Sequence, residues 1–234
     1  MPSLTEFFLN NFYFFSVILI SPIWLLIFTK RKESRKEMII MGIIFGLGAV
    51  LIARYYALFD YWHPTYLFGY FFNIEDFLYG FIFGGIVSEI YEFLFDKTNR
   101  KHRQKMPINK SVFVLFGLLL TLFCFYLLVN ILSFNSIFAH IIPPLAIGST
   151  MIMLRKDLAK PAILSGIIIT IFTFLCFMLV KIFWGDIFAN YWYLSNLSGI
   201  NIFSIPFEEL LFAFALGFGG SCFYEFVYNL RISK

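Results

Sequence analysis

The stretch Ile74-Glu-Asp-Phe-Leu-Tyr-Gly-Phe-Ile-Phe-Gly-Gly-Ile-Val-Ser-Glu-Ile-Tyr-Glu-Phe-Leu-Phe95 recurs near the C-terminus as Phe207-Glu-Glu-Leu-Leu-Phe-Ala-Phe-Ala-Leu-Gly-Phe-Gly-Gly-Ser-Cys-Phe-Tyr-Glu-Phe-Val-Tyr228. Each copy opens with two adjacent acidic residues and continues as an apolar run long enough to cross a bilayer. The recurrence predicts a tandem duplication. Acidic side chains beside hydrocarbon are costly and therefore indicate function.

The composition predicts an integral membrane protein with an all-α fold. Hydrophobic residues make up 60% of the chain and charged residues only 14%, which is too little polar surface for a soluble protein. Runs of roughly 20 apolar residues are needed to span about 30 Å of hydrocarbon. Seven such runs are expected, at about 7–29, 37–58, 75–95, 111–133, 136–154, 162–184 and 207–229. Pro143-Pro144 is expected to interrupt the fifth.

The duplication extends backwards from the quoted stretch. Tyr61-Trp62 recurs as Tyr191-Trp192, 130 positions later, and the offset becomes 133 at Glu75. Spans one to three therefore correspond to spans five to seven, with span four as the joiner. The predicted domains are a first repeat (1–96), a basic loop with the linking helix (97–135) and a second repeat (136–234). Because an odd number of helices separates the copies, this 3+1+3 repeat should be parallel.

Charge distribution predicts the orientation of this multi-pass protein. Sixteen of the 18 lysines and arginines fall in four groups, within 30–36, 97–110, 155–160 and 231–234. A seven-span topology puts all four on one side, and cytoplasmic loops carry the positive excess. We therefore expect a cytoplasmic or inner membrane protein with its C-terminus cytoplasmic and its N-terminus outside. The net charge of +4 suits anionic lipid headgroups, and no nucleic-acid partner is expected.

A stripe of small residues lies on spans three and seven. Gly80 and Gly84 are four residues apart in the first copy, and Gly217 follows Ala213 at the same spacing in the second. Small residues at this spacing let helix backbones approach closely in lipid. We expect a structural role for these glycines, with spans three and seven packed near the axis that relates the repeats.

The doubled acidic pairs are the candidate catalytic residues: Glu75, Asp76, Glu208 and Glu209. A helix N-terminus by itself favours acidic side chains, with Asn73 as a cap and Pro206 at a first helical position, so a structural role explains them too. Their repetition at one depth, among aromatic residues, favours chemistry instead. Apolar surroundings keep one carboxyl group protonated as an acid while a wetter partner acts as base. Which residue takes which role stays open, because neighbouring helix residues point about 100° apart.

Aromatic residues near the acids are the candidate substrate-binding set. They are Tyr79, Phe83, Phe212, Trp62, Trp192 and Tyr191. An aromatic belt at the membrane interface explains the loop residues equally well. Glu92 and Glu225 also recur, but pairing with lysine or arginine at the basic edge accounts for them. The histidines show no metal-ligand spacing, so no metal is expected.

These residues resemble a known family. The segments are Ser204-Ile-Pro-Phe-Glu-Glu-Leu-Leu-Phe212, Tyr191-Trp192-Tyr193, Ser198-Gly-Ile200 and, in the first copy, Asn73-Ile-Glu-Asp-Phe77. They are similar to the Pro-x-Glu-Glu/Asp signature of the membrane-integral lycopene cyclase domain family, the small helical type that occurs as two-subunit or fused cyclases and is unlike the flavoprotein cyclases. The resemblance covers both copies. Pro206 keeps the signature proline, whereas Asn73 replaces it, which puts the function of the first copy in doubt.

The resemblance implies an isomerase of carotenoid biosynthesis, of the intramolecular lyase class, that cyclises the acyclic end group of lycopene or a related polyene. Protonation of the terminal double bond gives a cation, an internal double bond attacks it, and loss of a ring proton yields the cyclic end. This reaction requires an acid, a base and a dry aromatic pocket, and it involves no redox change. We accordingly expect no cofactor. The expected partners are a lipophilic polyene and the lipid bilayer.

Two other functions remain open. A small transporter or proton-coupled carrier would also combine repeats with membrane carboxylates, although its acids would normally lie near mid-membrane. A catalytically inactive partner subunit of a cyclase is the other alternative. The sequence leaves undecided the exact substrate, whether one or both of its ends are cyclised, the ring isomer and whether the chain forms a homo-oligomer.

Overall fold

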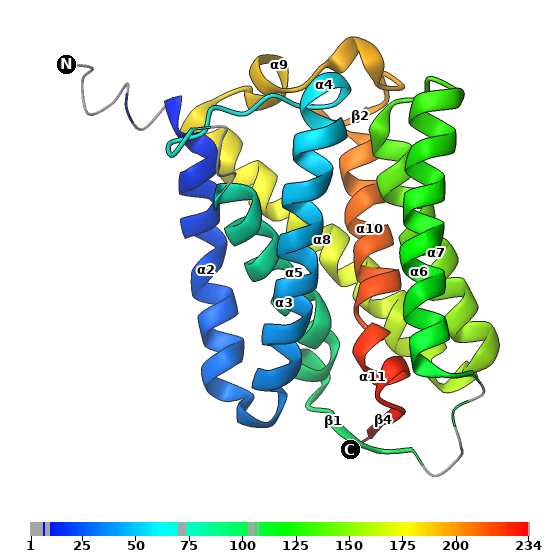
Figure 1. The fold of residues 1–234 in the computed structure, drawn as a ribbon. Helices are drawn as coiled ribbons and strands as arrows, with labels where there is room; N and C mark the ends of the chain where they lie inside the picture. The colour runs from blue at the N-terminus through cyan, green and yellow to red at the C-terminus, as the bar shows by residue number, and fades with distance from the viewer. Residues whose placement is uncertain (1–6, 8–9, 70–73, 103–105, 107, 234) are drawn as a thin grey trace. The chain divides into compact units, whose positions relative to one another are not determined.

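A computed structural model of the chain describes residues 1–234 apart from 1–6, 8–9, 70–73, 103–105, 107 and 234 (Figure 1). The described part is all-α and contains seven helices long and apolar enough to cross a membrane. The predicted fold class is therefore confirmed, and the helices are compatible with a multi-pass integral membrane protein. The parallel repeat is a separate prediction.

The seven candidate spans agree with the predicted runs to within a few residues, apart from a later start at the first and earlier starts at the second and sixth. In chain order they are α2 (Phe12–Lys30), α3 (Arg35–Ile52) continued by the π-helical η2 (Ala53–Ala57) and α4 (Leu58–Asp60), α5 (Ile74–Phe95), α6 (Lys110–Cys124) continued by the π-helical η3 (Phe125–Ile131), α7 (Ser136–Leu154), α8 (Ala159–Trp184), and α10 (Phe207–Gly220) followed by α11 (Phe223–Val227). Short elements connect them: the 3-10 turns η1 (Lys32–Ser34), η4 (Lys156–Leu158) and η5 (Leu194–Asn196), helix α9 (Ile187–Tyr191), and strands β1 (Thr98–Lys101), β2 (Asn201–Ile202), β3 (Ile205–Pro206) and β4 (Leu230–Ser233).

The expected interruption of the fifth span is wrong. Pro143 and Pro144 both lie inside the continuous helix α7. Each proline removes one backbone donor but keeps a φ that suits a helix, and membrane helices tolerate proline where neighbouring groups satisfy the freed carbonyls. The proline pair therefore leaves the span intact.

The chain divides into two compact units. Unit 1 comprises Met1–Ile86 and Thr173–Phe207, and unit 2 comprises Val87–Phe172 and Glu208–Lys234. The division runs through α5 and α8, so each unit takes part of both helices. The predicted domain boundaries remain a prediction.

In unit 1, helix α3 packs closely on α5 through glycines. A Cβ atom on Gly46 would lie 2.8 Å from the carbonyl oxygen of Phe77, and one on Gly42 would lie 2.8 Å from that of Phe81. Conversely, a Cβ on Gly80 would lie 2.8 Å from the Cα of Gly46. Only glycine allows the two backbones this approach, as expected for helices that associate in lipid.

In unit 2, helix α8 packs on α10 in the same way. A Cβ on Gly217 would lie 2.7 Å from the carbonyl oxygen of Ser165, and one on Gly166 would meet the ring of Phe214. The small-residue stripe therefore contacts the second span in unit 1 and the sixth span in unit 2. That spans three and seven pack near the axis relating the repeats stays a prediction.

The close contacts of the two units correspond in sequence. Gly42 and Gly166 are 124 positions apart, and their partners Phe81 and Phe214 are 133 positions apart. Helices α2 and α7 both have 19 residues, begin 124 positions apart and lead into a 3-10 turn. The duplication stays a prediction, and these correspondences favour it.

One pair of corresponding contacts exchanges its large and small members. In unit 1, a Cβ on Gly85 would meet the indole of Trp24. In unit 2, Phe218 corresponds to Gly85 and Gly148 corresponds to Trp24. A Cβ on Gly148 would lie 2.5 Å from the ring of Phe218. The bulky side chain thus comes from α2 in one unit and from α10 in the other.

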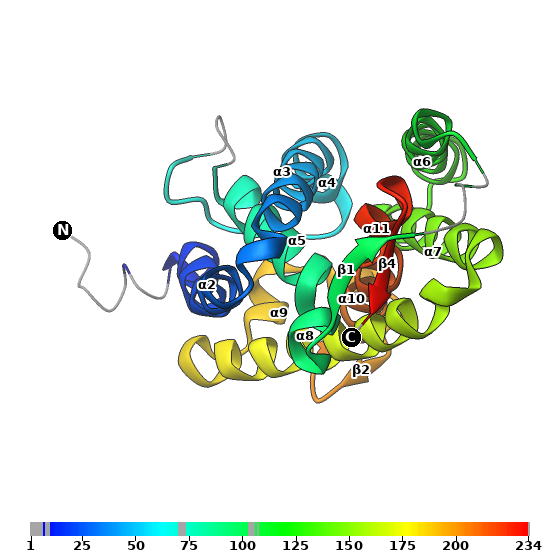
Figure 2. The ribbon, with the colours of Figure 1, turned by 90° about the horizontal axis from the view of Figure 1, so that it is seen from below.

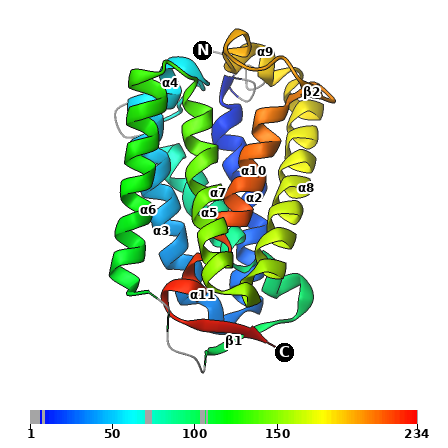
Figure 3. The same cartoon turned by 90° about the vertical axis from the view of Figure 1, so that its right-hand side faces the viewer.

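Unit 2 has its own apolar core and a short antiparallel ribbon. The core contains Phe113, Met151, Leu158, Ala162, Cys222 and Phe226. Helices α6 and α7 form an antiparallel hairpin (Figure 3), and strand β1 pairs with β4 after α11 (Figure 2). The Arg155 side chain donates to the carbonyl oxygen of Leu230 at 2.8 Å and to Asp157 at 2.7 Å, which ties the end of α7 to this ribbon.

We predict opposite effects for two alanine substitutions on α3. Gly46→Ala should lower stability by about 1–3 kcal/mol, because its Cβ clashes with the backbone of α5. Gly48→Ala should leave stability unchanged or raise it by up to about 1 kcal/mol, because nothing lies within 4 Å of the new Cβ and alanine favours a helix. Thermal unfolding in detergent measures both. Equal melting temperatures for the two variants would contradict the close α3–α5 contact.

Candidate active site

The first acidic pair lies at the start of α5. Glu75 and Asp76 are in the first turn of this helix, where the helix dipole favours negative charge. Their exposed fractions are 0% and 2%. Burying a carboxylate without hydrogen bonds costs free energy, so a buried carboxylate requires donors from the protein. The hydrogen-bond partners of each residue therefore indicate its role.

Asp76 accepts a hydrogen bond on each of its two oxygens. The hydroxyl of Tyr13, on α2, donates to Oδ1 at 2.8 Å, and the hydroxyl of Tyr66, in the loop before α5, donates to Oδ2 at 2.7 Å. Both tyrosines are buried. Two donors from different elements satisfy both oxygens and fix the plane of the carboxyl group.

Glu75 has a different environment from its neighbour. Its Oε1 accepts a hydrogen bond from the backbone N–H of Phe68 at 3.1 Å. Glu75 therefore binds the preceding loop, whereas Asp76 binds the two tyrosines. This divergence is what the 100° rotation between consecutive helix residues predicts.

Aromatic rings surround the Tyr13–Asp76 bond. The ring centroid of Tyr13 lies 4.6 Å from that of Trp62 and 5.8 Å from that of Tyr79, and Tyr79 stacks on Phe83 at 5.8 Å. These distances are typical of favourable ring contacts. The carboxyl group of Asp76 is thus held in a predominantly aromatic part of unit 1.

The repeated Tyr-Trp pairs meet in unit 1. Trp62 and Trp192 form an isolated antiparallel bridge, with ring centroids 5.5 Å apart. Phe12 packs on Tyr191 at 4.3 Å and on Trp192 at 6.4 Å. Trp192 is only 6% exposed. This burial favours a place inside unit 1 over an interfacial belt for the tryptophan pair.

The second acidic pair lies at the start of α10 in unit 2. Glu208 and Glu209 are in the first turn of the helix, 2% and 7% exposed. Phe212, one turn later, packs edge-on against His140 at 5.6 Å, and Nδ1 of His140 lies 2.6 Å from the carbonyl oxygen of Ser136. The expected first helical position of Pro206 is wrong by one residue, because Pro206 is in β3 and α10 begins at Phe207.

Another recurring acid, Glu225, has a structural partner. Oε1 of Glu225 accepts a hydrogen bond from Nδ2 of Asn99 at 2.6 Å, which connects α11 to β1 within unit 2. Glu92 and Glu225 are both buried. The contact with Asn99 favours the structural interpretation for Glu225.

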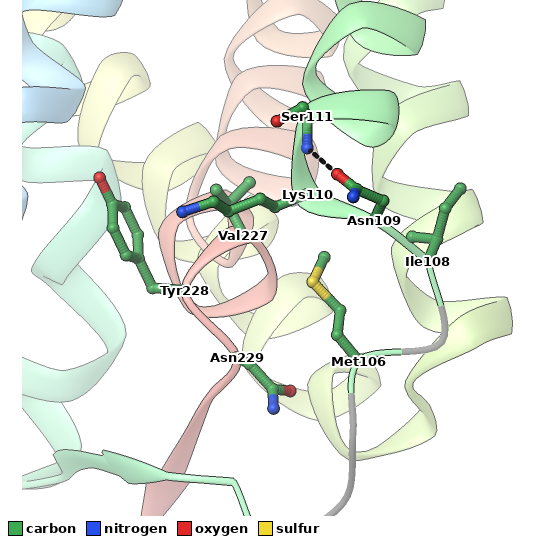
Figure 4. A pocket seen from close by; sticks show the side chains of 8 residues that line it. All are labelled: Met106, Ile108, Asn109, Lys110, Ser111, Val227, Tyr228 and Asn229. Carbon is green, nitrogen blue, oxygen red and sulfur yellow. Dashed lines mark hydrogen bonds between the residues drawn. The ribbon is translucent and has the colours of Figure 1, made fainter.

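A groove of about 580 Å³ lies in unit 2, between the segment that leads into α6 and the end of α11 (Figure 4). It is lined by Met106, Ile108, Asn109, Lys110, Ser111, Val227, Tyr228 and Asn229. Asn109 uses its side-chain oxygen to cap α6 at the N–H of Ser111, 2.8 Å away. The lining has no carboxyl group, so the groove cannot supply the chemistry expected of the acidic pairs.

Comparison with protein families finds one match, in the second half of the chain. Residues 135–227 match the lycopene cyclase family. This region contains α7, α8, α10 and α11, with Glu208, Glu209 and Phe212. The predicted resemblance to lycopene cyclases is confirmed there and indicates a carotenoid cyclase-like enzyme acting in a membrane. No curated protein and no solved structure matches the chain significantly.

The structure gathers the predicted lycopene cyclase residues in two places. Unit 1 brings together Glu75, Asp76, Tyr79, Phe83, Trp62, Tyr191 and Trp192, and unit 2 holds Glu208, Glu209 and Phe212. Convergence of all four acids remains a prediction. The departure from the lycopene cyclase signature at Asn73 lies outside the described residues.

Sequence reasoning missed Phe12 and Tyr13 as members of this site. Both were taken only as part of the first membrane span. A signal was present, because Tyr13 puts a hydroxyl near the outer end of an apolar run, at the depth predicted for the acids of the third span. A buried hydroxyl in lipid requires a polar partner.

We predict that Trp192→Ala destabilises the protein by about 3–5 kcal/mol, because it removes a buried ring that packs on Phe12, Trp62 and Phe188. Phe59→Ala, at a residue 73% exposed in the same unit, is the control and should change stability by less than about 0.5 kcal/mol. Thermal unfolding in detergent distinguishes them. A Trp192→Ala variant as stable as the control would mean that the tryptophan pair is not a structural centre of unit 1.

Proposed function

We propose that this protein is a lycopene cyclase-like isomerase that closes a ring at an acyclic end of a polyene by adding and then removing a proton. The observation that carries the proposal is the buried Asp76 carboxyl group, held by two hydroxyls among aromatic rings. The family match over residues 135–227 supports the same chemistry for the second acidic pair. We propose Glu75, Asp76, Glu208 and Glu209 as the acid and base groups.

The reaction proceeds by three bond changes. A carboxyl group donates its proton to the terminal double bond and leaves a tertiary cation. An internal double bond attacks this cation, which forms the ring and moves the positive charge to a ring carbon. A carboxylate then takes a proton from a neighbouring carbon, and the electrons of that C–H bond form the ring double bond. Substrate and product are isomers, so we propose that no cofactor takes part.

Burial of the acids suits such a reaction because water would capture the cation. All four proposed acids are at most 7% exposed. Rings such as those of Tyr79 and Phe83 can stabilise a nearby cation by up to about 2 kcal/mol each when water is excluded. The expected substrate is a lipophilic polyene that enters from the bilayer. We also propose that the C-terminus is cytoplasmic.

The position of the acids favours an enzyme over a carrier. Both pairs are in the first turns of α5 and α10, whereas a proton-coupled carrier is expected to place its acids near the middle of a broken helix. We therefore retain the cyclase as the single proposed function.

Expression in a lycopene-accumulating host, followed by pigment chromatography, tests the proposal. The wild type should convert lycopene to a product with one or two cyclic ends. Glu208→Gln should reduce conversion by about 100-fold or more, because loss of a general acid or base has effects of this size. Accumulated lycopene unchanged by wild-type protein that is present in the membrane would overturn the proposal.

The matched control is Glu92→Gln. Glu92 is also a buried glutamate of unit 2, 2% exposed, but it lies one residue from Tyr91 near the end of α5 and outside the acidic pairs. We expect this variant to retain cyclisation. Equal loss of product in both glutamine variants, with both proteins folded, would contradict the assignment of the acidic pairs.

A further inference from the structure

We propose that Tyr13 and Tyr66 position Asp76 as the base that removes the ring proton, and that they thereby decide which ring isomer forms. The inference rests on the proposed cyclase function. It assigns one carboxyl group to one half of the reaction and gives a purpose to two tyrosines that lie outside the acidic pairs.

The geometry restrains Asp76 from two sides. Each carboxylate oxygen accepts one hydroxyl, at 2.8 Å from Tyr13 and at 2.7 Å from Tyr66. The donors come from α2 and from the loop before α5, so the carboxyl group cannot rotate without losing one of them. The Tyr13 ring is itself held edge-on by Trp62 at 4.6 Å and packed against Tyr66 at 5.9 Å. The base is therefore fixed by rigid aromatic side chains.

Asp76 suits the role of base better than its neighbour. Its two oxygens both accept O–H groups, which is the pattern of an ionised carboxylate. It also adjoins the aromatic cluster through Tyr13, whose ring lies 5.8 Å from Tyr79. Glu75 instead accepts the backbone N–H of Phe68. Asp76 is thus linked through the Tyr13 hydroxyl to the rings that we propose to surround the cation.

The position of a base determines the product of such a reaction. The cyclised cation has three neighbouring carbons that carry hydrogen, and loss of a proton from each gives a different double-bond isomer. In every case the C–H bond breaks, its electron pair forms the new C=C bond and the proton moves to an oxygen of Asp76. A carboxylate held in one place selects one of the three protons, because proton transfer requires close contact.

The second copy has different residues at the corresponding positions. At the offset of 124 Tyr13 corresponds to Ile137, and at the offset of 130 Tyr66 corresponds to Asn196. Ile137 is fully buried in unit 2, and Asn196 donates to the carbonyl oxygen of Asp60 in unit 1. The residues that correspond to the two tyrosines therefore carry no hydroxyl, as expected if the two acidic pairs have different tasks.

Tyr13→Phe and Tyr66→Phe test the proposal, because each keeps the ring and removes one hydroxyl. Purified variants in liposomes of neutral lipid are supplied with lycopene, and chromatography resolves the ring isomers. We expect wild type to give one predominant isomer. Each variant should raise the share of the other isomers at least threefold and lower kcat about tenfold with little change in KM. Tyr61→Phe, at a tyrosine buried in the same loop (6% exposed), is the control and should leave the isomer ratio unchanged.

A second variant keeps the test decisive if the phenylalanine variants do not fold. Asp76→Glu retains the charge but moves the carboxylate by one methylene, so it should also broaden the isomer mixture. Cyclic product with the wild-type isomer ratio from the folded tyrosine variants, or from Asp76→Glu, would overturn the positioning role while leaving the cyclase function intact. Absence of cyclic product from the wild type would instead overturn the proposed function and this inference with it.

Discussion

A carboxyl group removed from water must find its hydrogen-bond donors inside the protein, and much of unit 1 is arranged to meet this demand. Asp76 is brought into an apolar setting by the first turn of α5, and its donors come from α2 and from the connecting loop. To deliver them, α2 must begin near the acids, the loop must fold back, and the rings of Trp62 and Tyr79 must fill the remaining space. The glycines between α3 and α5 hold the helix that carries the acids close to its neighbour.

Much of the fold follows from the sequence, because length and hydropathy alone decide which segments can cross a bilayer. The seven spans were predicted on that basis. The proline pair of α7 was misjudged because proline is costly in a soluble helix but acceptable where neighbouring groups satisfy the backbone. The helices that contact Gly80 and Gly217 could not be predicted, for a different reason. A small-residue stripe reveals which face of a helix is packed, but not which helix packs on it.

The acids of the candidate site were recognisable because charged residues in an apolar repeat are rare and therefore informative. Their hydrogen-bond partners were not, because Tyr13 is 63 positions away from Asp76 and a tyrosine at the end of a membrane span usually marks the interface. Only the folded chain connects the two. Trp62 and Trp192 illustrate the same limit, since their repetition was visible but their direct pairing depends on the tertiary structure.

The large residue of the contact is on α2 in the pair Trp24–Gly85 and on α10 in the pair Gly148–Phe218. This difference has a consequence for assembly in the membrane. A nascent chain with two similar sets of three helices risks combining members of different sets. Phe218 placed against Trp24 would put two large rings in one space, and Gly85 placed against Gly148 would leave a void. Steric mismatch therefore disfavours packing between helices of different sets and favours packing between helices of the same set.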